Sequence, residues 1–342
     1  MGTRFCIIVG LGNNMTSKAT AIAHPNIAFV KYWGRLDDKL RLPMNNSISM
    51  NLDPLSTITT VEFSDVYKKD DIQVLDSQTK KSDTSRVTAH LELIRKLMKI
   101  VTKARVVSKN TFPQSSGVGS SASGFAALTL AATKAIGLDC SEKELSILAR
   151  QGSGSASRSV PTGFVEWIAA ASSNESFAYT IAPYNHWDIR DIIAIIETSP
   201  KRVSSTKGHL QINTSAFYNA RLAKLHQTLA EVRTAILEKN FRMFGEAIEA
   251  EAISLHVVSM TSKPAIFYWA PATLRLIQAI QNWRLGGLEV YFTIDAGPNV
   301  HLICEAKNEQ KVKQMIAVLD GVREVLVAQP GEGVKLSENH LF

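Results

Sequence analysis

The chain has 342 residues, of which 45% are hydrophobic and 20% charged, and its formal net charge is +7. This composition is typical of a globular protein, and the length corresponds to two domains or one large one. No apolar run is long enough to span a membrane, and the basic residues are scattered, which favours a small anionic ligand over nucleic acid or a membrane as the partner.

The cysteines and the N-terminal residues bear on location. The chain contains three cysteines: Cys6, Cys140 and Cys304. An odd, sparse set without metal-ligand spacing predicts no disulfide framework and a reducing, cytoplasmic location. Residues 1–14 hold a short apolar run without a convincing cleavage site, and Gly10 and Gly12 match only part of a dinucleotide-binding motif. Since Met15 is a plausible start, we expect residues 1–14 to be a dispensable extension.

Hydrophobic periodicity predicts strands and helices in both halves of the chain. In the first half, strands are expected at 58–61 and 105–107, and helices at 88–103, after residue 124, and after a capping box of Ser141 with Glu144. In the second half, helices are expected at 215–238, 241–256, 271–283 and 308–319, and strands at 192–196, 288–294 and 300–304. Because strands and helices mix without regular alternation, we predict an α+β fold with a domain boundary near residue 185.

The loop Pro113–Gly124 is the first candidate site. It is rich in glycine and serine and runs directly into an apolar-periodic helix. Backbone N–H groups and the dipole at such a helix N-terminus attract phosphate, although the loop lacks the Gly-Lys-Ser/Thr ending of a Walker motif. We interpret the loop as a phosphate-binding site, with a flexible linker as the alternative.

Three further segments carry charged residues suited to anions or proton transfer. Lys31 and Arg35 lie in the segment 24–35, where an edge strand with solvated basic ends is the alternative. Arg158 follows several serines and could bind a carboxylate with two hydrogen bonds; a serine-capped helix start would explain the serines alone. Asp295 could orient a hydroxyl or accept its proton, or merely form an Asx-turn. Together, the segments suit phosphoryl transfer to a small anionic alcohol.

These segments resemble the mevalonate diphosphate decarboxylase family of the GHMP small-molecule kinase superfamily. The similar stretches occur in order along the chain: 24–34 (HPNIAFVKYWG), 46–49, 110–127, 149–159 (ARQGSGSASRS), 163–167, 203–208 and 292–299 (FTIDAGPN). The resemblance implies a two-domain GHMP kinase-like fold with a ligand cleft between the domains. The expected units are an extension (1–14), an ATP-binding domain (15–185) and a C-terminal domain (186–342).

The resemblance also implies an activity. The family uses ATP, accompanied by Mg²⁺, to phosphorylate the 3-hydroxyl of a mevalonate derivative, which then loses phosphate and CO2 to give an isopentenyl product. A cytoplasmic homodimer acting on a small anionic substrate is therefore expected. The alternatives are a mevalonate 3-kinase that does not decarboxylate and a non-catalytic ATP-binding protein.

The resemblance also implies roles for residues at matching positions in these segments. Catalysis is assigned to Asp295, Lys31 and Arg158; substrate binding to Asn26, Tyr32, Arg35, Ser153, Ser155 and Arg158; and ATP binding to Ser108, Asn110, Gly117, Gly119, Ser120, Ser121 and Ser123. No Mg²⁺ ligand is assigned.

The chain departs from the family's usual sequence at several places, some of them near the region expected to hold the 5-phosphate end of the substrate. His209 stands where methionine is usual, and Arg35 replaces a common lysine. The residues Gln114-Ser115-Ser116 form an unusual loop entry, and Val160-Pro161-Thr162 replaces the usual residues before Gly163. These departures make mevalonate 5-phosphate a candidate substrate beside mevalonate 5-diphosphate.

Overall fold

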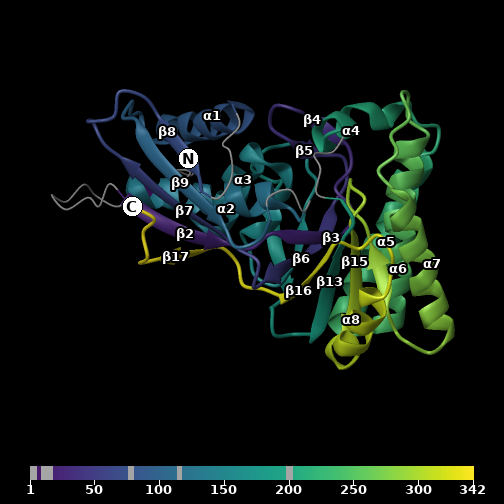
Figure 1. Cartoon of the computed structure of the whole chain (residues 1–342). Helices are drawn as coiled ribbons and strands as arrows, with labels where there is room; N and C mark the ends of the chain where they lie inside the picture. Colours follow the sequence, from purple (N-terminus) through teal and green to yellow (C-terminus); the bar gives the residue numbers. More distant parts are fainter. Residues whose placement is uncertain (1–5, 9–17, 76–80, 114–117, 198–202) are drawn as a thin grey trace.

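Two large β-sheets, two small two-stranded sheets and the packed helices make up the described chain in a computed structural model (Figure 1). The structure describes residues 6–8, 18–75, 81–113, 118–197 and 203–342. The mixture of strands and helices without regular βαβ alternation confirms the predicted α+β class. None of the helices within these ranges is long and apolar enough to cross a membrane.

The first sheet has five strands and carries one hydrophobic core. In spatial order the strands are β17 (Lys335–Ser337), β2 (Lys18–Ala23), β7 (Thr57–Phe63), β9 (Ala104–Asn110) and β8 (Asp71–Val74). The helices of this part are α1 (Lys81–Met98), α2 (Ser120–Ala135) and α3 (Glu142–Gly152). The alanine-rich α2 packs closely on β2 and β7, which places its N-terminus beside the strand ends at Thr57 and Asn110.

The second sheet has eight strands and joins the two halves of the chain. Its path is β12 (Ala178–Ala182), β11 (Phe164–Trp167), β6 (Ser47–Asp53), β16 (Glu324–Pro330), β13 (Ile189–Ile195), β15 (Val300–Glu305) and β14 (Tyr291–Thr293), with β3 (Asn26–Val30) paired to β6. The strands β6 and β16 pair at Leu52 and Pro330. This continuous sheet brings β3 and the end of β14 into one region of the molecule.

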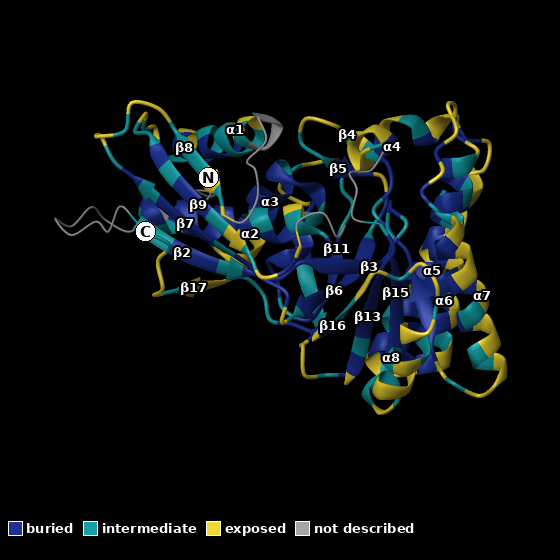
Figure 2. Cartoon of the chain, viewed as in Figure 1, coloured by how far each residue is buried: buried dark blue, intermediate teal, exposed yellow. Residues whose placement is uncertain are grey.

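Helices of the second half cover this sheet. They are α4 (Ser205–Gln211), α5 (Tyr218–Glu238), α6 (Phe241–Met260), α7 (Pro271–Leu285) and α8 (Glu309–Ala317). Figure 2 shows the strands largely buried and exposed residues along the outer sides of α5 and α7. Short pieces complete the described chain: β1 (Ile7–Ile8), β4 (Arg35–Asp37), β5 (Leu42–Pro43), β10 (Leu138–Asp139) and the 3₁₀ turns at Gly154–Ser159, Ile212–Thr214 and Ala306–Asn308.

One predicted helix is misplaced at both ends. The helix expected at 88–103 runs from Lys81 to Met98. It stops because Lys99 takes a left-handed backbone conformation (φ 54°), so Val101 is 84% exposed instead of lying on the apolar face. The capping box of Ser141 and Glu144 is present as predicted, because each residue bonds the other's backbone N–H.

The expectation that the cysteines form no disulfide is wrong. Cys6 and Cys140 are joined by a disulfide bond, and β1 pairs with β10 beside it. The backbone N–H of Cys6 also donates to Glu144 Oε1 at 2.7 Å. The two cysteines are 134 residues apart, so sequence spacing carries no sign of their contact. Gly10 and Gly12, which partly match a dinucleotide-binding motif, lie outside the described residues.

Candidate active site

The N-terminus of α2 lies at the predicted phosphate site, and its geometry suits an anion. Gly119 precedes the helix with φ 76°, a left-handed conformation that glycine adopts without strain. Among the described residues no side-chain hydrogen bond caps Gly119, and the N–H of Ala122 already donates to Gly119 O at 2.7 Å, so an anion would meet the N–H groups of Ser120 and Ser121. Gly117 lies outside the described residues.

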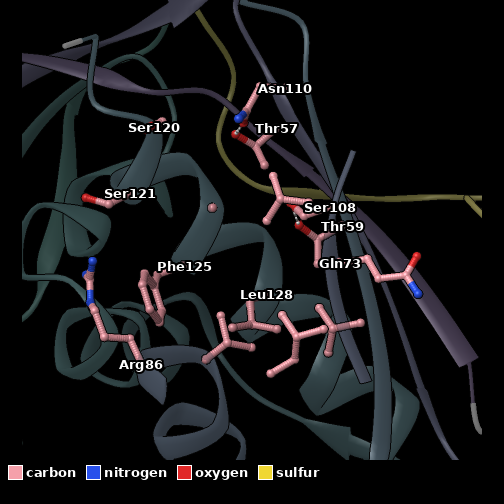
Figure 3. A pocket seen from close by; sticks show the side chains of 15 residues that line it. Thr57, Thr59, Gln73, Arg86, Ser108, Asn110, Ser120, Ser121, Phe125 and Leu128 are labelled. Atoms are coloured by element: carbon pink, nitrogen blue, oxygen red, sulfur yellow. Dashed lines mark hydrogen bonds between the residues drawn. The ribbon is translucent and has the colours of Figure 1, made fainter. Parts of the chain in front are cut away.

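A cavity of about 130 Å³ opens between this helix end and the first sheet (Figure 3). Ser121 and Arg86 lie on one side of it, and Ser108 and Asn110 on the opposite side. Apolar side chains complete its walls: Ile72, Val74, Val87, Val106, Phe125 and Leu128. Apolar walls with polar groups at their edges suit a heteroaromatic base whose phosphates extend towards the helix.

The predicted ATP-binding serines divide into two groups. Ser120 and Ser121 line the cavity. Ser123 is fully buried, and its hydroxyl bonds the hydroxyl of Thr57 at 2.6 Å, so this side chain ties α2 to β7. Asn110 accepts a hydrogen bond from Thr57 at 2.7 Å, which fixes the amide at the cavity edge.

A serine pair connects this cavity to a second polar cluster. The hydroxyls of Ser121 and Ser153 lie 3.3 Å apart. Ser153 ends α3 and begins the 3₁₀ turn that carries Ser155 and Arg158. The carbonyl of Ser155 accepts from the Asn26 amide at 3.0 Å. The structure therefore brings these predicted substrate residues next to the N-terminus of α2, where phosphate binding is predicted.

Arg158 is buried yet keeps hydrogen-bonding capacity. Its Nη1 donates to Ser47 Oγ at 2.7 Å, and its Nε and Nη2 donate to Asn26 Oδ1 at 3.3 and 3.1 Å. Nη1 and Nη2 each have a second N–H with no partner among the described residues. These two N–H groups are enough to bind one carboxylate with two hydrogen bonds. Burial lowers the pKa of Arg158 to about 10, so it stays cationic at neutral pH.

Lys31 and Asp295 meet across the two halves of the chain. Lys31 follows β3, Asp295 follows β14, and Lys31 Nζ lies 2.7 Å from Asp295 Oδ1. The lysine side chain is only 2% exposed, whereas the carboxylate is 39% exposed. Burial lowers the pKa of Lys31, although Asp295 and Glu251 oppose that shift. A buried cation thus holds a carboxylate that solvent and ligands can reach.

Tyr32 anchors the aromatic wall of this region. Its ring lies 4.7 Å from Trp167 and 4.3 Å from His209, and its hydroxyl accepts from Arg35 Nε at 2.8 Å. His209 Nδ1 accepts from the backbone N–H of Gly34 at 2.9 Å, which leaves the hydrogen of the neutral ring on Nε2. Burial lowers the pKa of His209 well below its usual value, so the ring is a neutral donor.

Several residues of this region were not predicted. Ser47 and Ser159 bond Arg158 and Asn26 respectively, and Arg41 and Arg86 donate to the carbonyls of Gln151 and Gly152. Ser47 lies within one of the segments that resemble the family, and this position could have identified it as a site residue. Arg41 and Arg86 had no such signal, because the fold brings them to the end of α3 from distant segments.

No group of three histidine, cysteine or acidic side chains that could hold a metal ion occurs in the part of the chain described above. Mg²⁺ is commonly held by substrate phosphates with only one or two protein carboxylates, so this composition fits an ion that arrives with a nucleotide. The serine hydroxyls at the start of α2 and the Asp295 carboxylate are oxygen donors of the kind it prefers.

Comparisons with known proteins agree along the chain. Residues 23–178 match the diphosphomevalonate decarboxylase-like N-terminal domain, and residues 191–332 match the mevalonate 5-diphosphate decarboxylase C-terminal domain. A diphosphomevalonate decarboxylase of Candida albicans is 35% identical over 316 residues, covering 87% of each chain. A phosphomevalonate decarboxylase of Haloferax volcanii is 31% identical over 301 residues, covering 88% of this chain and 92% of that one.

Solved structures show the same likeness. A structure of "MDDEF in complex with MVAPP, AMPPCP and Magnesium" matches with a TM-score of 0.89 and 37% identity, covering 94% of this chain and 99% of that one. The mevalonate diphosphate decarboxylase of Staphylococcus aureus matches with a TM-score of 0.89 and 34% identity, covering 94% and 98%.

Proposed function

Since the chain belongs to the diphosphomevalonate decarboxylase family, we propose that it catalyses the ATP-dependent decarboxylation of a 5-phosphorylated mevalonate. The substrate is mevalonate 5-diphosphate or mevalonate 5-phosphate. The products are the isopentenyl diphosphate or phosphate, CO2, ADP and inorganic phosphate. The contact between the buried Lys31 ammonium and the accessible Asp295 carboxylate carries this proposal.

Phosphorylation of the 3-hydroxyl comes first. Asp295 accepts the hydroxyl proton as the oxygen attacks the γ-phosphorus of ATP and ADP leaves. Lys31 holds the carboxylate at 2.7 Å and offsets negative charge where the reacting groups meet. Mg²⁺ bound with the nucleotide neutralises the polyphosphate. The nucleotide base occupies the cavity of Figure 3, with its phosphates towards Ser120 and Ser121.

Fragmentation follows, because a tertiary phosphate leaves more readily than a tertiary hydroxide. The C3–O bond breaks and phosphate departs, the C1–C2 electron pair forms the C2=C3 double bond, and C1 leaves as CO2. Arg158 holds the carboxylate through its two unused N–H groups, with Asn26 and Ser47 fixing the guanidinium. Ser153 and Ser155 flank the same ligand.

The phosphorylated end of the substrate lies towards Tyr32, Arg35 and His209 in this proposal. Arg35 supplies positive charge, and the Nε2–H of His209 supplies a neutral donor. A donor at this position suits phosphate oxygens, whereas the thioether of the usual methionine offers no hydrogen to donate.

We also propose a cytoplasmic homodimer, divided into an ATP-binding part (15–185) and a C-terminal part (186–342). ATP consumption suits the cytoplasm, and the family resemblance implies the dimer. Light scattering of the purified chain measures its mass, fractionation measures its location, and limited proteolysis measures where it divides. A monomer, an exported protein or a cut far from residue 185 would contradict the respective part.

Parallel assays test the activity itself. Purified protein is incubated with ATP, Mg²⁺ and mevalonate, mevalonate 5-phosphate or mevalonate 5-diphosphate, and CO2 and inorganic phosphate are measured together. Equal release of both from a 5-phosphorylated substrate is expected. ADP formation with a stable 3-phosphate and no CO2 would instead identify a 3-kinase.

A further inference from the structure

The backbone of Lys31 is held on both sides by one buried ion pair. Its N–H donates to Glu251 Oε1 at 3.1 Å, and its carbonyl accepts from Arg221 Nη2 at 3.1 Å. Arg221 and Glu251 also bond each other directly. Both are about 4% exposed, so the peptide groups around Lys31 are fixed from the interior.

The pair comes from helices that lie outside the segments of the proposed active site. Arg221 is on α5 and Glu251 on α6, and both helices pack against β3, whose last residue precedes Lys31. The lysine side chain is fixed separately, because Nζ donates to Ala28 O at 2.6 Å and to Asp295. Helices α5 and α6 therefore fix the position of the Lys31 backbone, from which the side chain extends to Asp295.

Stability alone is a weak reason for this arrangement. A buried ion pair commonly contributes no more than a well-packed apolar pair of similar volume, because both charges lose their water. Here two guanidinium nitrogens of Arg221, Nε and Nη1, are buried and have no hydrogen-bond partner in the described parts of the chain. The contacts that are made go to Glu251 and to the lysine backbone, which indicates a positioning role.

We infer that Arg221 and Glu251 are positioning residues that hold the backbone of Lys31 so that its ammonium group meets Asp295. They act through Lys31 and touch no reacting atom. The inference rests on the proposed function wherever it is tested by kcat or KM. Glu251 also contributes charge: it raises the pKa of Lys31, as Asp295 does, whereas burial and Arg158 lower it. His256, the other titratable group close to Lys31, is buried and neutral at pH 7.

The first test uses one substitution at two buried arginines. Arg221→Met removes one of two side-chain donors to the Lys31 carbonyl, and the other, Asn45 Nδ2 at 3.0 Å, remains. Arg95→Met removes a buried arginine that pairs with Asp70 beside α1, remote from Lys31. Because misplacement by about 1 Å can cost roughly 100-fold in rate, we expect kcat of Arg221→Met to fall by about 100-fold. KM for both substrates should change less than about threefold, and Arg95→Met should keep the wild-type kcat.

The second test separates charge from hydrogen bonding and covers the case in which Arg221→Met does not fold. Glu251→Gln keeps an acceptor for the Lys31 N–H but removes the negative charge, so the basic limb of the kcat–pH profile should move to lower pH. Asp70→Asn, at a carboxylate that also accepts a backbone N–H, from Ala104, should leave that limb unchanged.

The outcomes are decisive. Equal losses of kcat in Arg221→Met and Arg95→Met, or an unmoved basic limb in Glu251→Gln, would overturn the inference. A wild-type chain without turnover would instead refute the proposed function. The inference is then tested by NMR titration of ¹³C-labelled lysine, assigned with Lys31→Arg: Glu251→Gln should lower the Lys31 pKa, and an unchanged value would overturn it.

Discussion

Replacing Arg158 with methionine should disable substrate binding more than it disables folding. The change removes three hydrogen bonds, to Ser47 and Asn26, and leaves two buried acceptors without that donor. Each costs about 1–3 kcal/mol, partly offset because a buried cation is also removed. Two charge-assisted bonds to the substrate carboxylate are lost as well, at about 1.5–3 kcal/mol each. Their sum of roughly 3–6 kcal/mol corresponds to a fall in kcat/KM of about 10²- to 10⁴-fold.

Arg150 provides the matched control. It is also fully buried, its pKa is likewise lowered by burial to about 10, and it bonds Ser173 and Ser176. Arg150→Met should lower the melting temperature without a comparable change in kcat/KM. The assay follows ADP release against substrate concentration, with nucleotide affinity measured separately. If Arg158→Met stays within threefold of the wild type, or loses no more than Arg150→Met, the assignment of Arg158 to the substrate carboxylate is refuted.

Three further predictions concern other parts of the molecule. Burial lowers the pKa of His90 and His256 to about 3. Between about pH 6.5 and pH 3, these histidines are therefore protonated in the unfolded chain but neutral in the folded chain. The free energy of unfolding should therefore decrease as the pH falls below about 6.5, by up to about 1.4 kcal/mol per pH unit for each histidine. Urea unfolding of His90→Gln at several pH values should show a smaller pH dependence than the wild type; an equal pH dependence would contradict this. Cys6→Ser removes the disulfide between residues 134 apart and should lower the free energy of unfolding by up to about 5 kcal/mol without changing kcat. Loss of activity in this variant would show that residues 1–14 are not dispensable. His209→Met should raise KM for the 5-phosphorylated substrate about tenfold and leave KM for ATP unchanged, as expected for one lost hydrogen bond, and an unchanged KM would remove His209 from the substrate site.

Features encoded by neighbouring residues were predictable. The α+β class, the capping box at Ser141 and the helix that follows Gly119 all depend on local patterns, and the structure contains each of them. Helix ends were less predictable, as the exposed Val101 shows, because one left-handed residue stops a helix whose apolar spacing continues.

Contacts between distant segments escaped prediction. The Cys6–Cys140 disulfide and the support of Arg158 by Ser47 link segments more than 100 residues apart. The ion pair of Arg221 and Glu251 appears in sequence only as charged residues on two amphipathic helices, a pattern typical of solvated faces. Ser123 shows the opposite case, since a serine predicted to bind phosphate instead bonds Thr57 in the interior.

In the proposed mechanism the Asp295 carboxylate, held by Lys31, accepts the proton of the 3-hydroxyl. Asp295→Asn tests it most directly, because the amide keeps the shape of the side chain but is a poor proton acceptor. The measurement is kcat for CO2 release, together with ATP affinity. We expect turnover to be abolished while ATP affinity stays within about threefold of the wild type. CO2 release at a rate close to that of the wild type would contradict it.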